Sequence, residues 1–359
     1  MYSMICQNGS AFADGTFQPM LRRPVLGQRP HLSWRFVFVL IHEDDIPSRK
    51  LLQHPGKVCQ IFNMASGSPT FPVIVHPFQS PTPDSCAYEI GSKASSNSLI
   101  FIGGLTGGPH TSRTPRTLAH GLADASELDY SVWEFRMRSS YSGFGFSSIS
   151  NDAEDIKALV TYLRSLGKNK IVLMGVSTGC QDCIEYTNHA KYDTPPVDGY
   201  ILQSPVSDRE TASMSMPVDY LEATIATAKE MIAEGKHEDA MPRDSIPPVF
   251  SSPVTAYRWN SLAAKGGDDD FFSSDIRDDT LDTTFGRFDK PVLLMPAGKD
   301  ELVPPKVDKE ELLARWVKAC SQGVVSPLSA VNSTSDHGVT GTVAQKWMLE
   351  RIMSFLKSI

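Results

Sequence analysis

Long apolar runs are missing from this 359-residue sequence. Within the first 70 residues, the apolar run of note is 36–41, which is far short of the roughly 20 residues that cross a bilayer. No apolar segment with a small-residue cleavage site follows the initiator Met1, so we expect no secretory signal. A membrane span is not expected either.

Basic residues and cysteines are also few. Acidic residues outnumber basic ones 41 to 34, and the net charge of −7 comes without a basic stripe that would hold a nucleic-acid backbone. The cysteines are scattered, and a chain this long needs no disulfide framework, so we expect a reducing, cytoplasmic compartment. They are Cys6, Cys59, Cys86, Cys180, Cys183 and Cys320.

Cofactor motifs are absent as well. The glycine-rich stretch 103–108 lacks the G-x-G-x-x-G spacing and the acidic ribose partner of a dinucleotide site, and no Walker lysine with its Ser or Thr occurs. The run 266–270, Gly-Gly-Asp-Asp-Asp, lacks the ligand spacing of an EF-hand, which favours a solvated acidic loop. No metal or organic cofactor is expected.

Residues 1–70 differ in composition from the rest of the chain. Gly, Pro, Ser, Arg and Gln are frequent there, which predicts a disordered, dispensable extension. Up to His42, four arginines stand against the single acid Asp14, so an organelle transit peptide stays open. Met64 is an alternative natural start.

From Phe71 onward, strand and helix patterns alternate, and Pro, Ser, Asp and Asn mark the turns. The predicted strands are 72–77, 86–91, 98–103, 130–135, 171–174, 199–203, 292–295 and 327–331, the first two as an antiparallel hairpin. The predicted helices are 117–127, 152–166, 218–234, 307–319 and 342–356. We expect Asn151 and Glu154 to form a capping box on the second helix. This order predicts one α/β domain over 71–359, with an eight-stranded, mostly parallel sheet and helices on both faces.

One segment, 207–287, breaks this alternation between the sixth and seventh strands. Loops of this length inside a compact domain are usually functional, and its place in the order puts it over the carboxyl edge of the sheet. We predict a lid there, with Arg209, Arg243 and Arg258 available to a bulky, hydrogen-bonding substrate.

The strand 171–174 runs into Gly-Val-Ser-Thr-Gly at 175–179, which fits the G-x-S-x-G pattern of a nucleophile elbow. The flanking glycines let strand and helix backbones approach, and the strained turn exposes the Ser177 hydroxyl at the edge of the sheet. Unpaired N–H groups of the following helix can stabilise an oxyanion beside it. The elbow predicts an α/β-hydrolase fold with Ser177 as nucleophile.

A serine nucleophile needs a histidine base and a carboxylate, and in this fold the chain order is Ser, acid, His. Three histidines follow Ser177. His189 lies too far along the nucleophile helix and His237 lies in the predicted lid, which leaves His337 as the base. For the acid we prefer Asp300, in the loop after the seventh strand. The alternatives are Glu301, Asp208 and Asp336.

The oxyanion hole is expected to combine the backbone N–H of Thr178 with that of Leu105, in the glycine-rich loop after the third strand. Cys180 and Cys183 form a C-x-x-C pattern at the head of the nucleophile helix. A redox pair is one interpretation, but the elbow covers these residues, so we expect them to pack in the interior.

Several stretches together resemble one known family. They are Phe-Ile-Gly-Gly-Leu at 101–105, Ser-Ser-Tyr-Ser-Gly-Phe-Gly at 139–145, the elbow continued to 182, the pair 197–203 and 205–210, and Gly-Lys-Asp-Glu at 298–301. Over 71–357 the chain resembles fungal α/β-hydrolases that include the intracellular siderophore esterase acting on fusarinine-type hydroxamates. The resemblance supports Ser177, Asp300 and His337 as the triad. Family members tend to have histidine where this chain has Val176, which bears on substrate preference.

The resemblance implies an esterase that forms an acyl-enzyme on Ser177 and cleaves a small-molecule ester, a fusarinine-type siderophore, with iron release as the consequence. A thioesterase or peptidase on the same triad stays open. A catalytically silent binding protein also stays open, although the intact Ser, Asp and His set speaks against it. The sequence does not specify an oligomeric state.

Overall fold

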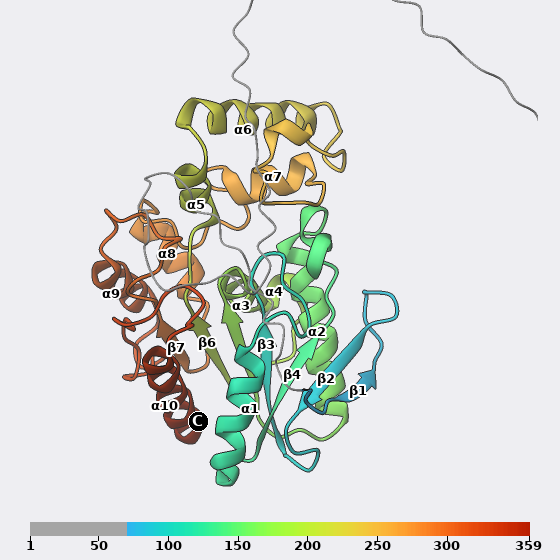
Figure 1. Ribbon diagram of the computed structural model, residues 1–359, viewed down its shortest axis with the longest axis vertical. Helices are drawn as coiled ribbons and strands as arrows, with labels where there is room; N and C mark the ends of the chain where they lie inside the picture. Colours follow the sequence, from blue (N-terminus) through green and yellow to red (C-terminus); the bar gives the residue numbers. More distant parts are fainter. Residues whose placement is uncertain (1–69) are drawn as a thin grey trace, which may run out of the picture. The chain divides into compact units, whose positions relative to one another are not determined.

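A seven-stranded sheet lies at the centre of residues 70–359, the part of the chain that the computed structural model describes (Figure 1). The predicted extension and Met64 lie outside the described residues. The strands are β1 Ile74–Pro77, β2 Cys86–Ile90, β3 Asn97–Ile102, β4 Tyr130–Phe135, β5 Ile171–Val176, β6 Gly199–Gln203 and β7 Val292–Met295. Their order is β1-β2-β4-β3-β5-β6-β7. β1 pairs antiparallel with β2, and β2 with β4, whereas all later pairs are parallel, so the predicted hairpin and mostly parallel sheet are confirmed.

The prediction of an eighth strand, beginning at Pro327, was wrong for the described residues. Pro327 has no N–H for a sheet ladder, and the N–H of Ser329 bonds back to the carbonyl of Ser326 in a turn. The segment still runs beside β7. The N–H groups of Ser326, Ala330 and Asn332 donate to carbonyls along and just beyond that strand, with isolated bridges instead of a continuous strand.

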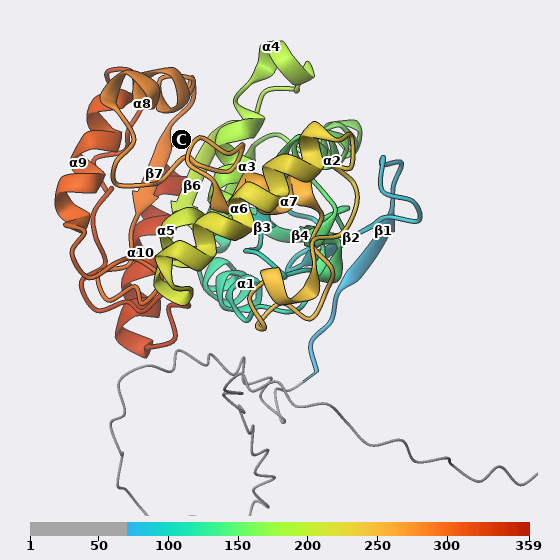
Figure 2. The ribbon, with the colours of Figure 1, turned by 90° about the horizontal axis from the view of Figure 1, so that it is seen from above.

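Helices cover both faces of the sheet (Figures 1 and 2). The helices are α1 Thr114–Asp124, α2 Ile149–Ser165, α3 Gly179–Tyr186, α4 His189–Tyr192, α5 Asp208–Ser215, α6 Val218–Ala233, α7 Ala256–Ala263, α8 Asp278–Phe285, α9 Lys309–Ala319 and α10 Thr342–Ser358. On β3, the buried side chains of Leu99 and Phe101 pack with α1 and α10, while those of Ile100 and Ile102 pack with α2 and α3. Side chains that alternate along this buried strand thus contribute to two hydrophobic cores, one on each face of the sheet.

α2 begins one turn earlier than predicted, and its cap differs. The Oγ of Ser148 accepts the N–H of Asn151 at 3.1 Å, so Ser148 is the N-cap. Glu154 pairs with Arg138 at 2.8 Å and does not close a capping box on Asn151. The earlier start places Asp152 in the first turn of the helix, where its carboxyl is buried.

The segment predicted as a lid is largely helical. It holds α5 to α8 between β6 and β7, and residues of α6 and α7 form a separate apolar cluster with Phe144, from the loop after β4. The N–H of Thr255 donates to the carbonyl of Gly145 in that same loop, so this part of the insertion lies at the carboxyl edge of the sheet. In Figure 2 the sheet is seen from above, with α6 lying across it. α8 instead packs against α9.

The sequence predicts that the acidic run 266–270 is a solvated loop, and for Asp269 this prediction was wrong. Asp269 is buried and pairs with the equally buried Arg258 of α7. The partner stands eleven residues earlier in the chain, and only the folded insertion brings the two charges together.

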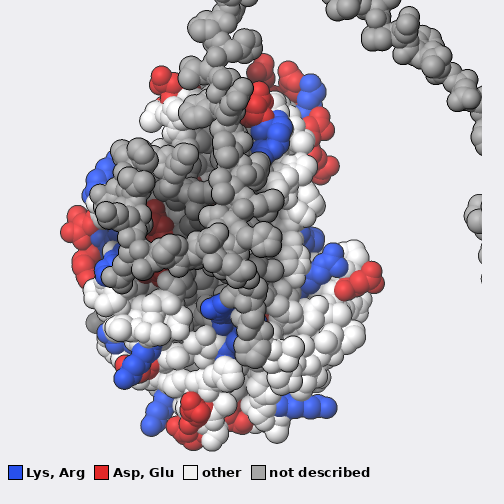
Figure 3. Space-filling view, viewed as in Figure 1, with Lys and Arg blue, Asp and Glu red and all other residues white. Residues whose placement is uncertain are grey.

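The visible surface carries both signs of charge. Lys and Arg are interspersed with Asp and Glu wherever the face in Figure 3 is not covered by grey atoms, and no large basic area is seen there. Among the described helices, none combines the length and apolar character that crossing a bilayer requires.

Candidate active site

The turn between β5 and α3 holds Ser177 in the left-handed region, with φ of 58°. This conformation is costly for a residue with a side chain, and such strain is concentrated at functional sites. A Cβ at Gly175 would lie 2.1 Å from the carbonyl oxygen of Gly179, and one at Gly179 would lie 2.3 Å from that of Ile102. Strand, turn and helix therefore approach as closely as the elbow pattern predicts.

Gly175→Ala is expected to destabilise the protein by about 1 to 3 kcal/mol or more, because the added methyl meets backbone atoms that cannot rotate away. Urea unfolding measures this loss. Gly341→Ala is the matched control, since a Cβ there meets open space and its φ is an ordinary −75°; because Gly341 is the N-cap of α10, this variant is expected to lose about 0.5 to 1 kcal/mol, less than Gly175→Ala. Equal stability of the two variants would contradict the close approach at the elbow.

Ser177, His337 and Asp300 are brought together at the carboxyl edge of the sheet. His337 Nε2 lies 2.9 Å from the Oγ of Ser177, and His337 Nδ1 lies 2.8 Å and 3.0 Å from the two carboxylate oxygens of Asp300. Asp300 is 5% exposed and also accepts the N–H of Leu302 at 3.0 Å. The three side chains form a continuous hydrogen-bonded chain with the geometry of a catalytic triad.

Backbone contacts hold the two loops that carry Asp300 and His337. The N–H of Lys299 donates to the carbonyl of Ser335 at 2.8 Å. Glu301, an alternative for the acid, has an oxygen on the backbone N–H of His337 at 3.0 Å, so it supports the loop that presents the imidazole. The loop after β7 and the loop before α10 are thus fixed to each other.

Among the described residues, neither remaining alternative for the acid bonds to the His337 ring, and neither other histidine bonds to the Ser177 hydroxyl. Asp208 accepts from the side-chain amide of Gln181 at 2.8 Å, and Asp336 accepts the N–H of Thr340 at 2.7 Å. His189 bonds to Thr194, and His237 is exposed beside Glu238. His189 belongs to the separate helix α4 and not to the nucleophile helix, where the sequence placed it.

The glycine-rich loop after β3 packs directly against the elbow. A Cβ at Gly104 would lie 2.7 Å from that of Ser177. The next residue, Leu105, and Thr178 both line a pocket at this point. Within residues 70–359, neither of their backbone N–H groups donates a hydrogen bond. Two unpaired donors beside a serine hydroxyl are what an oxyanion hole requires.

Two predictions near the elbow have different outcomes. Cys180 and Cys183 are fully buried and unpaired, and burial raises the pKa of both thiols well above the usual range, so the prediction of interior packing is confirmed. Val176 is half-buried at the end of β5 and packs against the core on the α1 and α10 side. Its effect on substrate preference stays a prediction.

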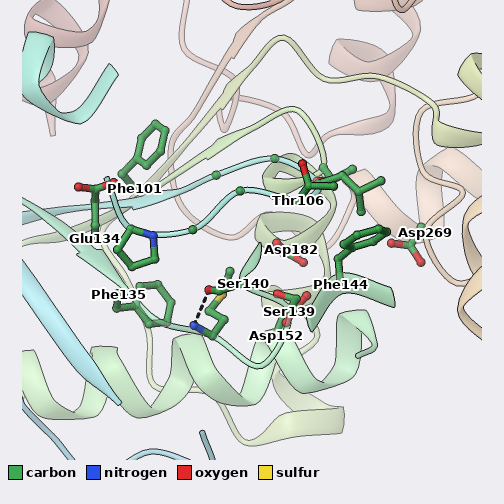
Figure 4. Close-up of a pocket in the computed structure, with 18 of the residues that line it drawn as sticks. Phe101, Thr106, Glu134, Phe135, Ser139, Ser140, Phe144, Asp152, Asp182 and Asp269 are labelled. Carbon is green, nitrogen blue, oxygen red and sulfur yellow. Dashed lines mark hydrogen bonds between the residues drawn. The ribbon is translucent and has the colours of Figure 1, made fainter. Parts of the chain in front are cut away.

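A small pocket, with a cavity volume of about 40 Å³, adjoins the elbow (Figure 4). Its walls are the glycine-rich loop, the end of β4 with the loop that follows, the first turns of α2 and α3, and two residues of the insertion, Arg258 and Asp269. Thr178 and Gly104 form its border with the Ser177 side. The pocket therefore opens beside the proposed oxyanion donors.

Acidic side chains gather at this pocket, and sequence patterns did not reveal them. Asp152 and Asp182 are buried in its wall, and Asp208 lies nearby. Burial raises the pKa of Asp152 to about 7, and desolvation raises the pKa of Asp208 to about 8. Burial also raises the pKa of Asp182 well above its usual range, with Asp152 and Asp269 adding to the effect. The helices α2, α3 and α5 and the loop that holds Asp269 supply these residues, so no spacing in the sequence marks them.

Asp152 should make the stability of the protein depend on pH. Its folded pKa of about 7 exceeds the usual value of about 4, so between these values the folded state binds more protons than the unfolded state. The free energy of unfolding should therefore fall as pH rises through this window, by on the order of 2 kcal/mol between about pH 5 and pH 8. Asp152→Asn should remove this share, as measured by urea unfolding of both proteins at the two pH values. An unchanged pH dependence in the variant would contradict the assignment.

Comparison with known proteins identifies the family. The family described as "Protein of unknown function (DUF1749)" matches residues 64–357. The chain belongs to this family. It is 31% identical over 279 residues to the UPF0613 protein PB24D3.06c of Schizosaccharomyces pombe, covering 72% of this chain and 87% of that protein. It is 30% identical over 272 residues to the fusarinine C esterase sidJ of Aspergillus fumigatus, covering 62% and 76%.

A solved structure of a related protein has a similar fold. The siderophore hydrolase EstB from Aspergillus fumigatus superposes with a TM-score of 0.68 at 25% identity, over 80% of this chain and 98% of that one. The predicted α/β-hydrolase fold and the predicted membership of a fungal esterase family are confirmed. These relatives support hydrolase activity of the esterase type.

Proposed function

We propose that this protein is a serine esterase that cleaves ester bonds of a fusarinine-type hydroxamate siderophore. The observation that carries the proposal is the hydrogen-bonded chain from Ser177 through His337 to Asp300, at the end of β5. The names of two relatives, a fusarinine C esterase and a siderophore hydrolase, favour an ester of this class over a thioester or an amide.

In the first half-reaction, the Oγ of Ser177 attacks the ester carbonyl carbon while its proton passes to His337 Nε2. Asp300 holds the proton on Nδ1 and stabilises the imidazolium. The negative charge on the carbonyl oxygen is taken up by the N–H groups of Leu105 and Thr178. His337 then gives its proton to the leaving alkoxide, which departs as an alcohol and leaves the acyl-enzyme.

In the second half-reaction, a water molecule attacks the acyl carbon and gives its proton to His337. The tetrahedral intermediate collapses, the proton returns to Ser177, and the carboxylic acid leaves. The elbow, the glycine-rich loop and the two loops after β7 supply all the protein groups that these two half-reactions need.

The polar site suits a hydrogen-bonding substrate. The residues that make it polar differ from the arginines that the sequence indicated. Arg258 is buried on Asp269, and Arg209 pairs with Asp275, so the insertion does not present these two arginines as free cations. Polar groups instead come from the pocket wall, among them Ser139. This polar wall favours a substrate richer in oxygen and nitrogen than a lipid tail.

The proposed reaction has a consequence for bound iron. Cleaving an ester linkage between hydroxamate units removes the effective concentration that keeps them around one metal ion. Weaker fragments would then release iron. We place this step in the cytoplasm, and the four unpaired cysteines of the described residues are compatible with a reducing compartment.

Mass spectrometry of the products tests the function. Purified protein is incubated with fusarinine-type and triacetylated siderophores, and with short-chain and long-chain nitrophenyl esters, a thioester and an amide. We expect siderophore fragments that correspond to hydrolysed ester linkages and that do not form with Ser177→Ala. Preference for long-chain esters without siderophore cleavage would overturn the substrate, and preference for the thioester or amide would overturn the ester class.

A further inference from the structure

The pocket beside the elbow has an excess of negative groups. Asp152, Asp182 and Asp269 all line it, and each is at least nine-tenths buried. Figure 4 shows these three side chains together with Phe144 in the pocket wall. Asp208 interacts electrostatically with Asp182 and Asp269. Burying several carboxylates without cations to pair with them is unfavourable, so a cation in this pocket would stabilise the protein.

Arg258 supplies positive charge but is already engaged. Its Nη1 donates to both oxygens of Asp269, at 2.7 Å and 2.9 Å, and its Nε donates to the carbonyl of Phe144 at 3.0 Å. Arg258 also lies near Asp152, Asp182 and Asp208, but one guanidinium balances one carboxylate. Within residues 70–359, Asp152, Asp182 and Asp208 form no ion pair with a cation.

One carboxylate oxygen of Asp152 lacks a hydrogen-bond partner among the described residues. The residue is 3% exposed, and its Oδ1 has no hydrogen-bond partner in the described part of the chain although it is buried. A buried carboxylate oxygen without a partner is costly, and native proteins rarely leave one. Because Asp152 lines the pocket, a group bound there could satisfy this oxygen.

We propose that this pocket binds a primary ammonium group of the substrate through Asp152 and Asp182. Charge-assisted hydrogen bonds from the three N–H donors of an ammonium group satisfy several carboxylate oxygens at once. Burial raises the pKa of both Asp152 and Asp182, and a bound ammonium group would lower both again. Within residues 70–359, no group of three or more His, Cys, Asp or Glu side chains is arranged to hold a metal ion, which favours an organic cation.

The site is close enough to Ser177 for one small molecule to reach both. Asp182 lies one helical turn after Thr178, an axial rise of about 6 Å. A chain of several bonds thus separates the ammonium group from the ester carbonyl. This inference rests on the proposed function, because the cation belongs to the ester that Ser177 attacks.

Matched pairs of esters test the site. Methyl 6-aminohexanoate and methyl heptanoate have acyl chains of equal length, one ending in an ammonium and one in a methyl group, and 6-aminohexyl acetate and heptyl acetate make the same comparison on the alcohol side. We expect kcat/KM for the ammonium ester to exceed that of its neutral partner about tenfold or more in at least one pair, the size of a charge-assisted interaction. No preference in either pair would overturn the proposal.

Variants locate the preference. Asp152→Asn and Asp182→Asn should each reduce the ratio of the two kcat/KM values towards one, while Asp275→Asn, an exposed carboxylate on Arg209, should leave the ratio at its wild-type value. A ratio that persists in both pocket variants would also overturn the site. Hydrolysis of the neutral esters without ammonium preference would refute this site alone, whereas the absence of any ester hydrolysis would refute the proposed function.

Discussion

Ser177→Ala is expected to lower kcat on an ester substrate by about 10⁴-fold to 10⁶-fold without unfolding the protein. The change removes the attacking oxygen, and with it the 2.9 Å contact to His337, but no backbone contact of the elbow. Steady-state kinetics measures the loss, and labelling by a fluorophosphonate probe should disappear with it.

The matched control is Ser165→Ala, at an exposed hydroxyl on α2 that donates to the carbonyl of Tyr162. It should keep both activity and labelling. A Ser177→Ala variant that turns over substrate near the wild-type rate, with its circular dichroism unchanged, would show that the nucleophile is misassigned.

Asp300→Asn is expected to lower kcat by about 10⁴-fold. Oδ1 of Asp300 accepts the N–H of Leu302, so an asparagine would keep its oxygen there and turn its NH₂ towards His337 Nδ1. The imidazole would then carry its proton on Nε2, and this nitrogen could no longer accept the Ser177 proton. Kinetics at a fixed pH on one ester measures the effect.

Glu301→Gln is the matched control for this variant. Its oxygen contacts the backbone N–H of His337, and a glutamine oxygen can accept the same bond. We therefore expect a much smaller loss than for Asp300→Asn. The reverse ranking would move the acid to Glu301.

The elbow was predictable because its signal is local. One strand, two glycines and one serine lie within a few residues, and the order of Ser, acid and His follows from the order of parallel strands. His337 and Asp300 could be named for that reason, each in a loop beyond a strand candidate. Chain order predicts an insertion at 207–287, and the structure has α5 to α8 between β6 and β7.

Features that depend on tertiary contacts were not predictable. The strand at Pro327 failed because Pro327 has no N–H and the N–H of Ser329 donates back to the carbonyl of Ser326. The aspartates of 266–270 read as a solvated loop because nothing in their spacing points to Arg258. The acidic pocket stayed hidden for the same reason, since Asp152 belongs to α2 and Asp182 to α3. Local patterns specify elements, whereas burial of charge is decided by how elements meet.

Trapping of the acyl group tests the proposed reaction most directly. The wild-type protein is mixed with a fusarinine-type siderophore, and the reaction is quenched in acid within the first turnover. The protein is then digested, and the mass of the peptide containing Ser177 is measured by mass spectrometry. We predict the mass of the hydroxamate acyl fragment on Ser177, and its absence from the Ser177→Ala protein. Cleavage of the siderophore with the acyl group on another residue, or with no acylated Ser177 during the first turnover, would contradict the proposal.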